Sequence, residues 1–161
     1  CAQSRGAHSD PGVMACFTGQ GHIFADELRG LLASSASVRE LVATINCELE
    51  EAAHEFSVEP FNVEGALRGN SNELLRPSVS CPLITLTQLT TAWLTLEKYP
   101  RFSEMQRGLL GVTGHSQGIL AAAAFASAAS RLDFLRAIGT AVKVAWIIGR
   151  YVDAVAGGMA L

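Results

Sequence analysis

A serine held between two glycines constrains the fold of this chain more than any other feature. The pentapeptide GHSQG, centred on Ser116, follows an apolar run at 109–112 and precedes an alanine-rich stretch at 119–129. This order predicts a short buried strand, a sharp turn and a helix. Side chains two positions from the serine would collide with the helix and the neighbouring strand. Gly114 and Gly118 avoid that collision, so the pattern predicts a nucleophile elbow.

Such a turn would present the Ser116 hydroxyl at the N-terminus of the following helix. The unpaired N–H groups and the dipole of a helix N-terminus favour developing negative charge. The backbone N–H of Gln117 is therefore a predicted oxyanion donor. A glycine-rich loop with an inert surface serine would explain the glycine spacing only as coincidence.

A second glycine-rich loop follows the first apolar run of the chain, at 13–17. Gly19 and Gly21 permit backbone conformations that other residues rarely adopt. Gln20, between them, is the predicted source of a second oxyanion N–H, if this loop lies beside the elbow. Without the elbow, the same residues would indicate an ordinary turn.

The rest of the chain is mainly helical in pattern. Residues 1–12 show no periodicity and are predicted to form a linker or frayed lead-in. The other expected elements are helices at 25–32, at 37–54 after a capping box at Ser37, from Pro82 to Pro100, at 119–129 and at 130–156, with an irregular connection at 56–80 that holds at most a helical turn at 63–67. Strands that alternate with helices predict an α/β fold with a parallel sheet.

The composition excludes several classes of function. The net charge is −3, and the 12 basic residues are scattered along 161 positions, which argues against a nucleic-acid surface. The four cysteines lie far apart, so we expect no metal site and free, mostly buried thiols in a reducing compartment. No signal peptide is evident, and the most apolar helix, 119–129, is shorter than the roughly 20 residues that span a bilayer. We therefore expect a cytoplasmic protein.

A nucleophilic serine needs a base, and the histidines of this chain do not offer one. His115 adjoins Ser116, so its side chain should point elsewhere, and we interpret it as a packed or hydrogen-bonded structural residue. The others, His8, His22 and His54, fall in the lead-in, a loop and an acidic helix face. We expect the base beyond Leu161, in a domain of which 13–161 is the N-terminal part.

The two glycine-rich loops together resemble a known family. The TGQG run at 18–21 paired with GHSQG is similar to the signature of acyl-CoA:acyl-carrier-protein transacylases. The SCPLI run at 80–84 and the GVT run at 111–113 look like those of the acetyltransferase domain of the fungal-type fatty acid synthase β subunit. The resemblance covers 13–155, and it implies a partial acyltransferase domain with an α/β-hydrolase-like fold.

The resemblance also implies roles for individual residues. Ser116 would be acylated, and the backbone N–H groups of Gln117 and Gln20 would form the oxyanion hole. The family's catalytic histidine has no matching position in this chain. Four residues are expected at the substrate: Gly19, Gly21, His115 and Ile148.

Ile148 bears on substrate choice. Malonyl-specific relatives carry an arginine before a glycine in the long helix, and aligning that pair with Ile148 and Gly149 places isoleucine where the arginine would be. An apolar side chain cannot offset a desolvated carboxylate, so a neutral starter such as acetyl is implied. Helical periodicity equally allows Ile148 to be a core residue.

The implied reaction transfers an acyl group in two halves. Acetyl-CoA would acylate Ser116, and the phosphopantetheine thiol of an acyl carrier protein would then accept the acyl group. The expected partners are therefore acetyl-CoA, the carrier protein and other domains and subunits of a fatty acid synthase complex. No cofactor, metal, nucleic acid or membrane is expected.

Three alternatives remain open. The same chemistry could serve as the starter-unit transacylase of a polyketide or secondary-metabolite synthase. A serine esterase of the α/β-hydrolase type would release the acyl group to water. A structural remnant would keep the elbow without its base.

Overall fold

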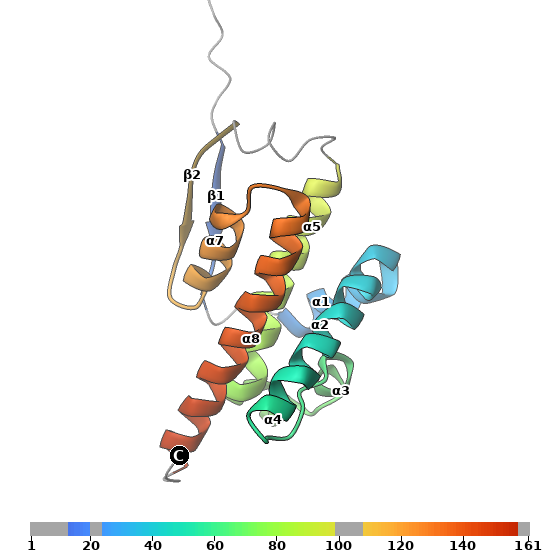
Figure 1. Cartoon of the computed structure of the whole chain (residues 1–161), viewed down its shortest axis with the longest axis vertical. Coiled ribbons are helices and arrows are strands. Elements are labelled where there is room, and N and C mark those ends of the chain that lie inside the picture. Colours follow the sequence, from blue (N-terminus) through green and yellow to red (C-terminus); the bar gives the residue numbers. More distant parts are fainter. Residues whose placement is uncertain (1–12, 20–23, 99–107, 158–161) are drawn as a thin grey trace, which may run out of the picture.

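The computed structural model describes residues 13–19, 24–98 and 108–157. Within these ranges a small parallel sheet lies beside a larger helical part (Figure 1). In chain order the elements are β1 (Val13–Phe17), α1 (Phe24–Ser34), α2 (Ala36–Glu55), α3 (Val63–Leu67), α4 (Ser71–Leu75), α5 (Pro77–Glu97), β2 (Leu109–Gly114), α7 (Gly118–Ser127) and α8 (Arg131–Ala156). The predicted lead-in, 1–12, lies outside the described residues.

The two strands pair in parallel, which confirms the predicted α/β class. Phe17 lies opposite Gly114, so the carboxyl ends of both strands meet at one edge. The expectation of a buried strand is wrong, because Leu110 is 76% exposed. Helix α7 packs against both strands, and exposed residues alternate with half-buried ones along β1 from Met14 to Phe17, as in a sheet with one covered face.

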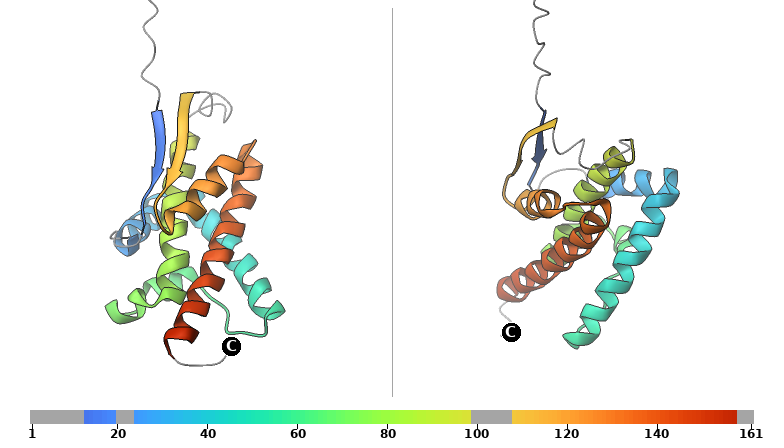
Figure 2. Two further views of the ribbon diagram at one scale, coloured as in Figure 1. Left: turned by 90° about the vertical axis from the view of Figure 1, so that its left-hand side faces the viewer. Right: turned by 45° about the horizontal axis from the view of Figure 1, so that its top comes forward.

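Helices α5 and α8 form the centre of the helical part and lie side by side in every view (Figure 2). They come close together at Gly149, where a Cβ would collide with the Pro77 carbonyl and lie 2.8 Å from the Ser78 Cα. Asp153, one turn further along α8, accepts hydrogen bonds from the Ser78 backbone N–H at 3.2 Å and from its hydroxyl. The start of α5 is thus fixed to α8.

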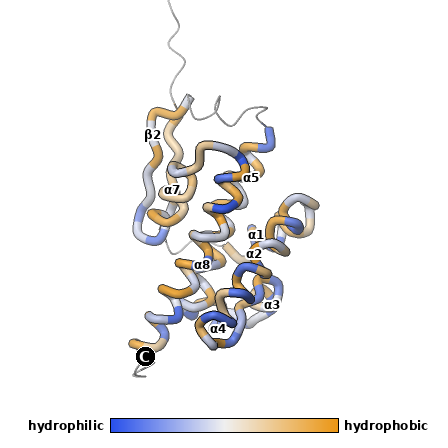
Figure 3. The backbone as a smooth tube through the Cα atoms, in the orientation of Figure 1, coloured by the Kyte–Doolittle hydropathy of each residue, from blue (hydrophilic) through white to orange (hydrophobic). Residues whose placement is uncertain are grey.

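Aromatic side chains connect the sheet to these helices. The Phe125 ring on α7 lies 5.6 Å from that of Phe17 on β1 and meets Phe134 of α8 edge-on at 5.4 Å. Trp93 of α5 stacks on Phe134 at 6.4 Å. Figure 3 shows the hydrophobic residues distributed along α7 and along parts of α5 and α8. One apolar core therefore supports both strands.

Two predicted helix starts are wrong. Pro77, not Pro82, occupies the first turn of α5, and Pro82 lies inside the helix. Pro77 is favourable there, since N–H groups of the first turn have no intrahelical acceptor, whereas Pro82 cannot donate the hydrogen bond that a residue inside the helix would make. Helix α2 begins earlier than expected because Ser35, rather than Ser37, caps it through a 3.3 Å hydrogen bond from the Val38 N–H.

The connection at 56–80 is more regular than expected. Helix α3 coincides with the predicted turn, but α4 was not predicted. Asn70 and Glu73 form a capping box at its start, in which Glu73 accepts from the Asn70 N–H at 3.0 Å. Asparagine and glutamate in this spacing are a helix-start signal that the abundance of polar residues concealed.

The cysteines differ from expectation. Cys16 and Cys47 are exposed free thiols, and Cys81 is half-buried, so the prediction of mostly buried thiols is wrong. Burial raises the pKa of the Cys81 thiol above its ordinary value. Groups of three or more metal-ligating side chains are absent from the described ranges.

Helix α5 is longer than any apolar helix expected from the sequence. By length and composition alone it could cross a membrane, but 56% of its apolar window is buried inside the structure. It packs against α8, α1 and α7. The core helix of a globular domain has the same properties.

Candidate functional site

Ser116 lies in the turn between β2 and α7 with its side chain exposed. Its φ of 53° falls in the left-handed region, which non-glycine residues rarely occupy because Cβ crowds the backbone. Ser57, after α2, is the other non-glycine residue with positive φ in the described ranges. Only at Ser116 does this conformation join a parallel strand to a helix.

The two glycines that flank Ser116 occupy positions where no side chain fits. A Cβ on Gly114 would collide with the Gly118 carbonyl and lie 2.7 Å from the Ile119 nitrogen. A Cβ on Gly118 would collide with the carbonyls of Phe17 and Thr18. The steric requirement predicted from the sequence is therefore met on both sides, against the helix and against the neighbouring strand.

The loop after β1 lies against this turn, which is the condition that the role predicted for Gln20 requires. The His115 N–H donates to the Phe17 carbonyl at 3.0 Å. A Cβ on Gly19 would lie 3.0 Å from the His115 carbonyl oxygen and 3.1 Å from the Ser116 Cβ. Gly19 therefore lies close to Ser116, where a Cβ would make a tight contact. Gln20 and Gly21, the next two predicted site residues, lie outside the described residues.

Gln117 connects the turn to α5 through its side chain. It precedes α7, but its carboxamide does not cap that helix. The carboxamide instead donates to the Cys81 carbonyl and lies 3.3 Å from the Thr85 hydroxyl oxygen. Only the backbone N–H of Gln117 was predicted to have a role, and this side-chain contact was not predicted.

The first backbone hydrogen bonds of α7 join residues three positions apart, as in a 3₁₀ turn. The N–H groups of Gly118, Ile119 and Leu120 donate to the carbonyls three residues earlier, at 2.9, 3.1 and 3.1 Å. The Gln117 N–H precedes this set, at the positive end of the helix dipole. An anion at Ser116 would therefore meet a favourable local field.

The His115 side chain is exposed, so it is not a buried packed residue, and the alternative of a hydrogen-bonded structural residue stays a prediction. Its structural contribution comes from the backbone, since its carbonyl accepts from the Gly118 N–H at 2.9 Å. His54 is exposed near the end of α2, while His8 and His22 lie outside the described residues. The described residues thus identify no general base for Ser116.

Ile148 is 45% exposed on α8. This exposure removes the alternative that it is a core residue. Its neighbour Gly149 is buried against α5 at the close approach described above.

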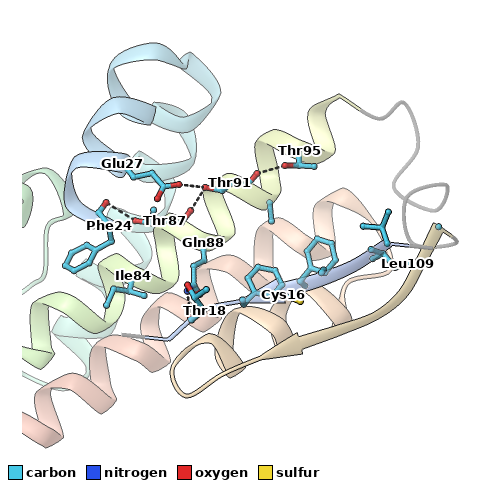
Figure 4. A pocket seen from close by; sticks show the side chains of 16 residues that line it. Cys16, Thr18, Phe24, Glu27, Ile84, Thr87, Gln88, Thr91, Thr95 and Leu109 are labelled. Atoms are coloured by element: carbon cyan, nitrogen blue, oxygen red, sulfur yellow. Dashed lines mark hydrogen bonds between the residues drawn. The ribbon is translucent and has the colours of Figure 1, made fainter. Parts of the chain in front are cut away.

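A cavity of about 470 Å³ runs along β1 on the side of α1 and α5 (Figure 4). Its walls are mainly apolar, and Thr18 and Gln88 both contribute to them. The Gln88 carboxamide donates to the Thr18 carbonyl, so this wall adjoins the loop that packs on Ser116. Gln88 was also missed, although it is the one amide side chain in a predominantly apolar helix.

Comparison with known proteins gives one family and two relatives. The model of a family described as starter unit:ACP transacylase in aflatoxin biosynthesis matches residues 15–160. The chain is 34% identical over 154 residues to the fatty acid synthase beta subunit aflB of Emericella nidulans, covering 85% of this chain and 7% of that protein. It is 43% identical over 77 residues to the fatty acid synthase subunit beta of Gibberella zeae, covering 47% of this chain and 4% of that protein.

Proposed function

Because the chain belongs to the starter unit:ACP transacylase family, we propose that Ser116 carries an acyl group from a CoA thioester to an acyl carrier protein. The observation that carries the proposal is the backbone of Ser116, held at φ 53° between a strand and a helix with its side chain exposed. We further propose that this turn is the nucleophile elbow of an α/β-hydrolase-like acyltransferase domain.

The reaction would proceed through an acyl-serine. The Ser116 Oγ attacks the thioester carbon, a new C–O bond forms, the C–S bond breaks, and the serine proton leaves with the CoA thiol. The phosphopantetheine thiol of the carrier protein then attacks the ester, and Ser116 recovers its proton. A general base must mediate both proton transfers, and we expect it beyond Leu161.

Negative charge on the carbonyl oxygen would be stabilised at the start of α7. The Gln117 N–H is one proposed donor, supported by its place before the first bonded N–H of that helix. The Gln20 N–H is the other, supported by the contact of its neighbour Gly19 with Ser116. The transferred group would be a neutral starter such as acetyl, because Ile148 offers a carboxylate no countercharge.

Acyl-enzyme trapping tests this function. The natural full-length gene product is mixed with labelled acetyl-CoA, quenched in acid and digested, and the label should be found on the peptide that contains Ser116. Ser116→Ala should reduce labelling to background. Ser127→Ala is the matched control, since Ser127 ends α7 and its hydroxyl donates only to the local Ala124 carbonyl, at 3.1 Å. Labelling that survives Ser116→Ala, or that never forms in the unaltered protein, contradicts the proposal.

The family description favours a second biosynthetic setting with the same chemistry, starter-unit transfer in secondary metabolism. Isolated acyl-enzyme can be offered carrier proteins from a fatty acid synthase and from a polyketide synthase in parallel. Faster discharge to the polyketide carrier would support the second setting. Discharge to water that outpaces both carriers would indicate an esterase instead.

A further inference from the structure

We propose that Gln88 is a positioning residue for the reaction at Ser116, because its carboxamide holds Thr18 and Gly19 against the turn that carries the serine. This inference rests on the proposed function. Gln88 lies on α5, 70 residues along the chain from Thr18, and Figure 4 shows its side chain extending from that helix toward Thr18.

The contact between Gln88 and Thr18 fixes the orientation of the amide. The Gln88 Nε2 donates to the Thr18 carbonyl and lies 3.3 Å from the Thr18 hydroxyl oxygen. A flipped amide would place its oxygen against the Thr18 carbonyl, where neither atom can donate. The Gln88 Oε1 is buried and has no hydrogen-bond partner within the described ranges, which carries a cost in stability. An apolar residue would avoid this cost but could not hold the loop.

The loop held by Gln88 packs directly on the nucleophile. Gly19 follows Thr18, and a Cβ on it would be in tight contact with the His115 carbonyl oxygen at 3.0 Å and the Ser116 Cβ at 3.1 Å. A large movement of Thr18 toward the turn would therefore press on Ser116. Movement away would open a gap beside the serine.

Helix α5 also holds the other side of the turn. Gln117 donates to the Cys81 carbonyl and approaches the Thr85 hydroxyl, as described above. Positions 81, 85 and 88 are spaced by four and three residues, so they lie along one face of α5. This face therefore sets the distance between the two loops that meet at Ser116. Gln117 attaches the turn after β2 to it, and Gln88 attaches the loop after β1.

Two substitutions at Gln88 test this role in the natural full-length gene product. Gln88→Met keeps the length and removes the donor. Gln88→Glu keeps the shape but, when ionised, places a second acceptor against the Thr18 carbonyl. Both should slow single-turnover acetylation of Ser116 by about tenfold to a hundredfold, because a small misplacement of reacting groups has an effect of this size. The acetyl-CoA concentration that gives half-saturation should change little.

The pH dependence of Gln88→Glu separates positioning from general damage to the fold. A protonated carboxyl can donate to the Thr18 carbonyl, whereas a carboxylate cannot. The ratio of the variant's acetylation rate to that of the unaltered protein, measured at each pH, should therefore rise as pH falls from about 7.5 toward the glutamate pKa, ordinarily about 4.3. For Gln88→Met the same ratio should stay constant.

Thr95→Val is the matched control on the same helix. The Thr95 hydroxyl donates only within α5, to the Thr91 carbonyl at 2.9 Å, so acetylation should be unchanged. Unchanged acetylation in both Gln88 variants would overturn the inference and leave the proposed function standing. An unaltered protein that is not acetylated on Ser116 would overturn both. If circular dichroism shows that Gln88→Met does not fold, Gln88→Glu alone decides. A ratio of acetylation rates that rises as pH falls supports the inference, and a ratio that does not change with pH overturns it.

Discussion

At the scale of single residues, the backbone of Ser116 predicts a conflict between stability and function. A left-handed conformation costs a residue with Cβ roughly 1–2 kcal/mol, and glycine avoids this cost at the expense of a more flexible unfolded chain. We therefore expect Ser116→Gly to be more stable than Ser116→Ala by about 1 kcal/mol. Urea denaturation of the two variants measures the difference. Equal midpoints would show that the positive φ carries no strain.

A second residue-scale prediction concerns specificity. Ile148→Arg should raise malonyl loading relative to acetyl, because a guanidinium can pair with the free malonyl carboxylate. The exposure of position 148 predicts that the free energy of unfolding changes by no more than about 0.5 kcal/mol. Competition between labelled malonyl-CoA and acetyl-CoA measures the ratio. Ile147→Arg is the control, since Ile147 is adjacent and 39% exposed, and an equal shift there would remove the argument for a specific role.

At the scale of elements, the contact of α5 with α8 requires glycine at position 149. A Cβ at Gly149 would collide with backbone at the start of α5, which cannot move as a flexible side chain can. We expect Gly149→Ala to lower the free energy of unfolding by about 1–3 kcal/mol, as overpacked sites do. Gly30→Ala on α1 meets nothing within 4 Å and should instead stabilise by up to about 1 kcal/mol through helix propensity. Thermal unfolding compares the pair, and a stabilising Gly149→Ala would show that the helices can separate freely.

The helix boundaries show which elements are predictable from local pattern. Helix α8 follows the predicted periodicity closely, with Ser130 capping it through a 3.1 Å hydrogen bond from the Asp133 N–H. The start of α5 was misplaced because either proline, at 77 or 82, could occupy the first position of a helix, and the contacts of Ser78 with Asp153 on α8 that accompany the earlier start are not local in sequence.

At the scale of the whole molecule, the sequence predicts what depends on neighbours in the chain. The turn at Ser116 could be predicted because the glycines that permit it are two residues away. The contacts of Gln88 with Thr18 and of Gln117 with Cys81 could not, because they join residues 70 and 36 positions apart. Exposure of the strands was also unpredictable, since it depends on which face α7 covers.

The attachment of both loops to α5 has a consequence for thermal motion. If α5 shifts as a rigid rod, Thr18 and Gln117 travel with it, and the geometry around Ser116 is preserved while the surrounding helices breathe. A distortion that bends α5 between Cys81 and Gln88, or that breaks one of the two amide contacts, would change the spacing at Ser116. The two contacts thus couple the motion of both loops to the motion of one helix.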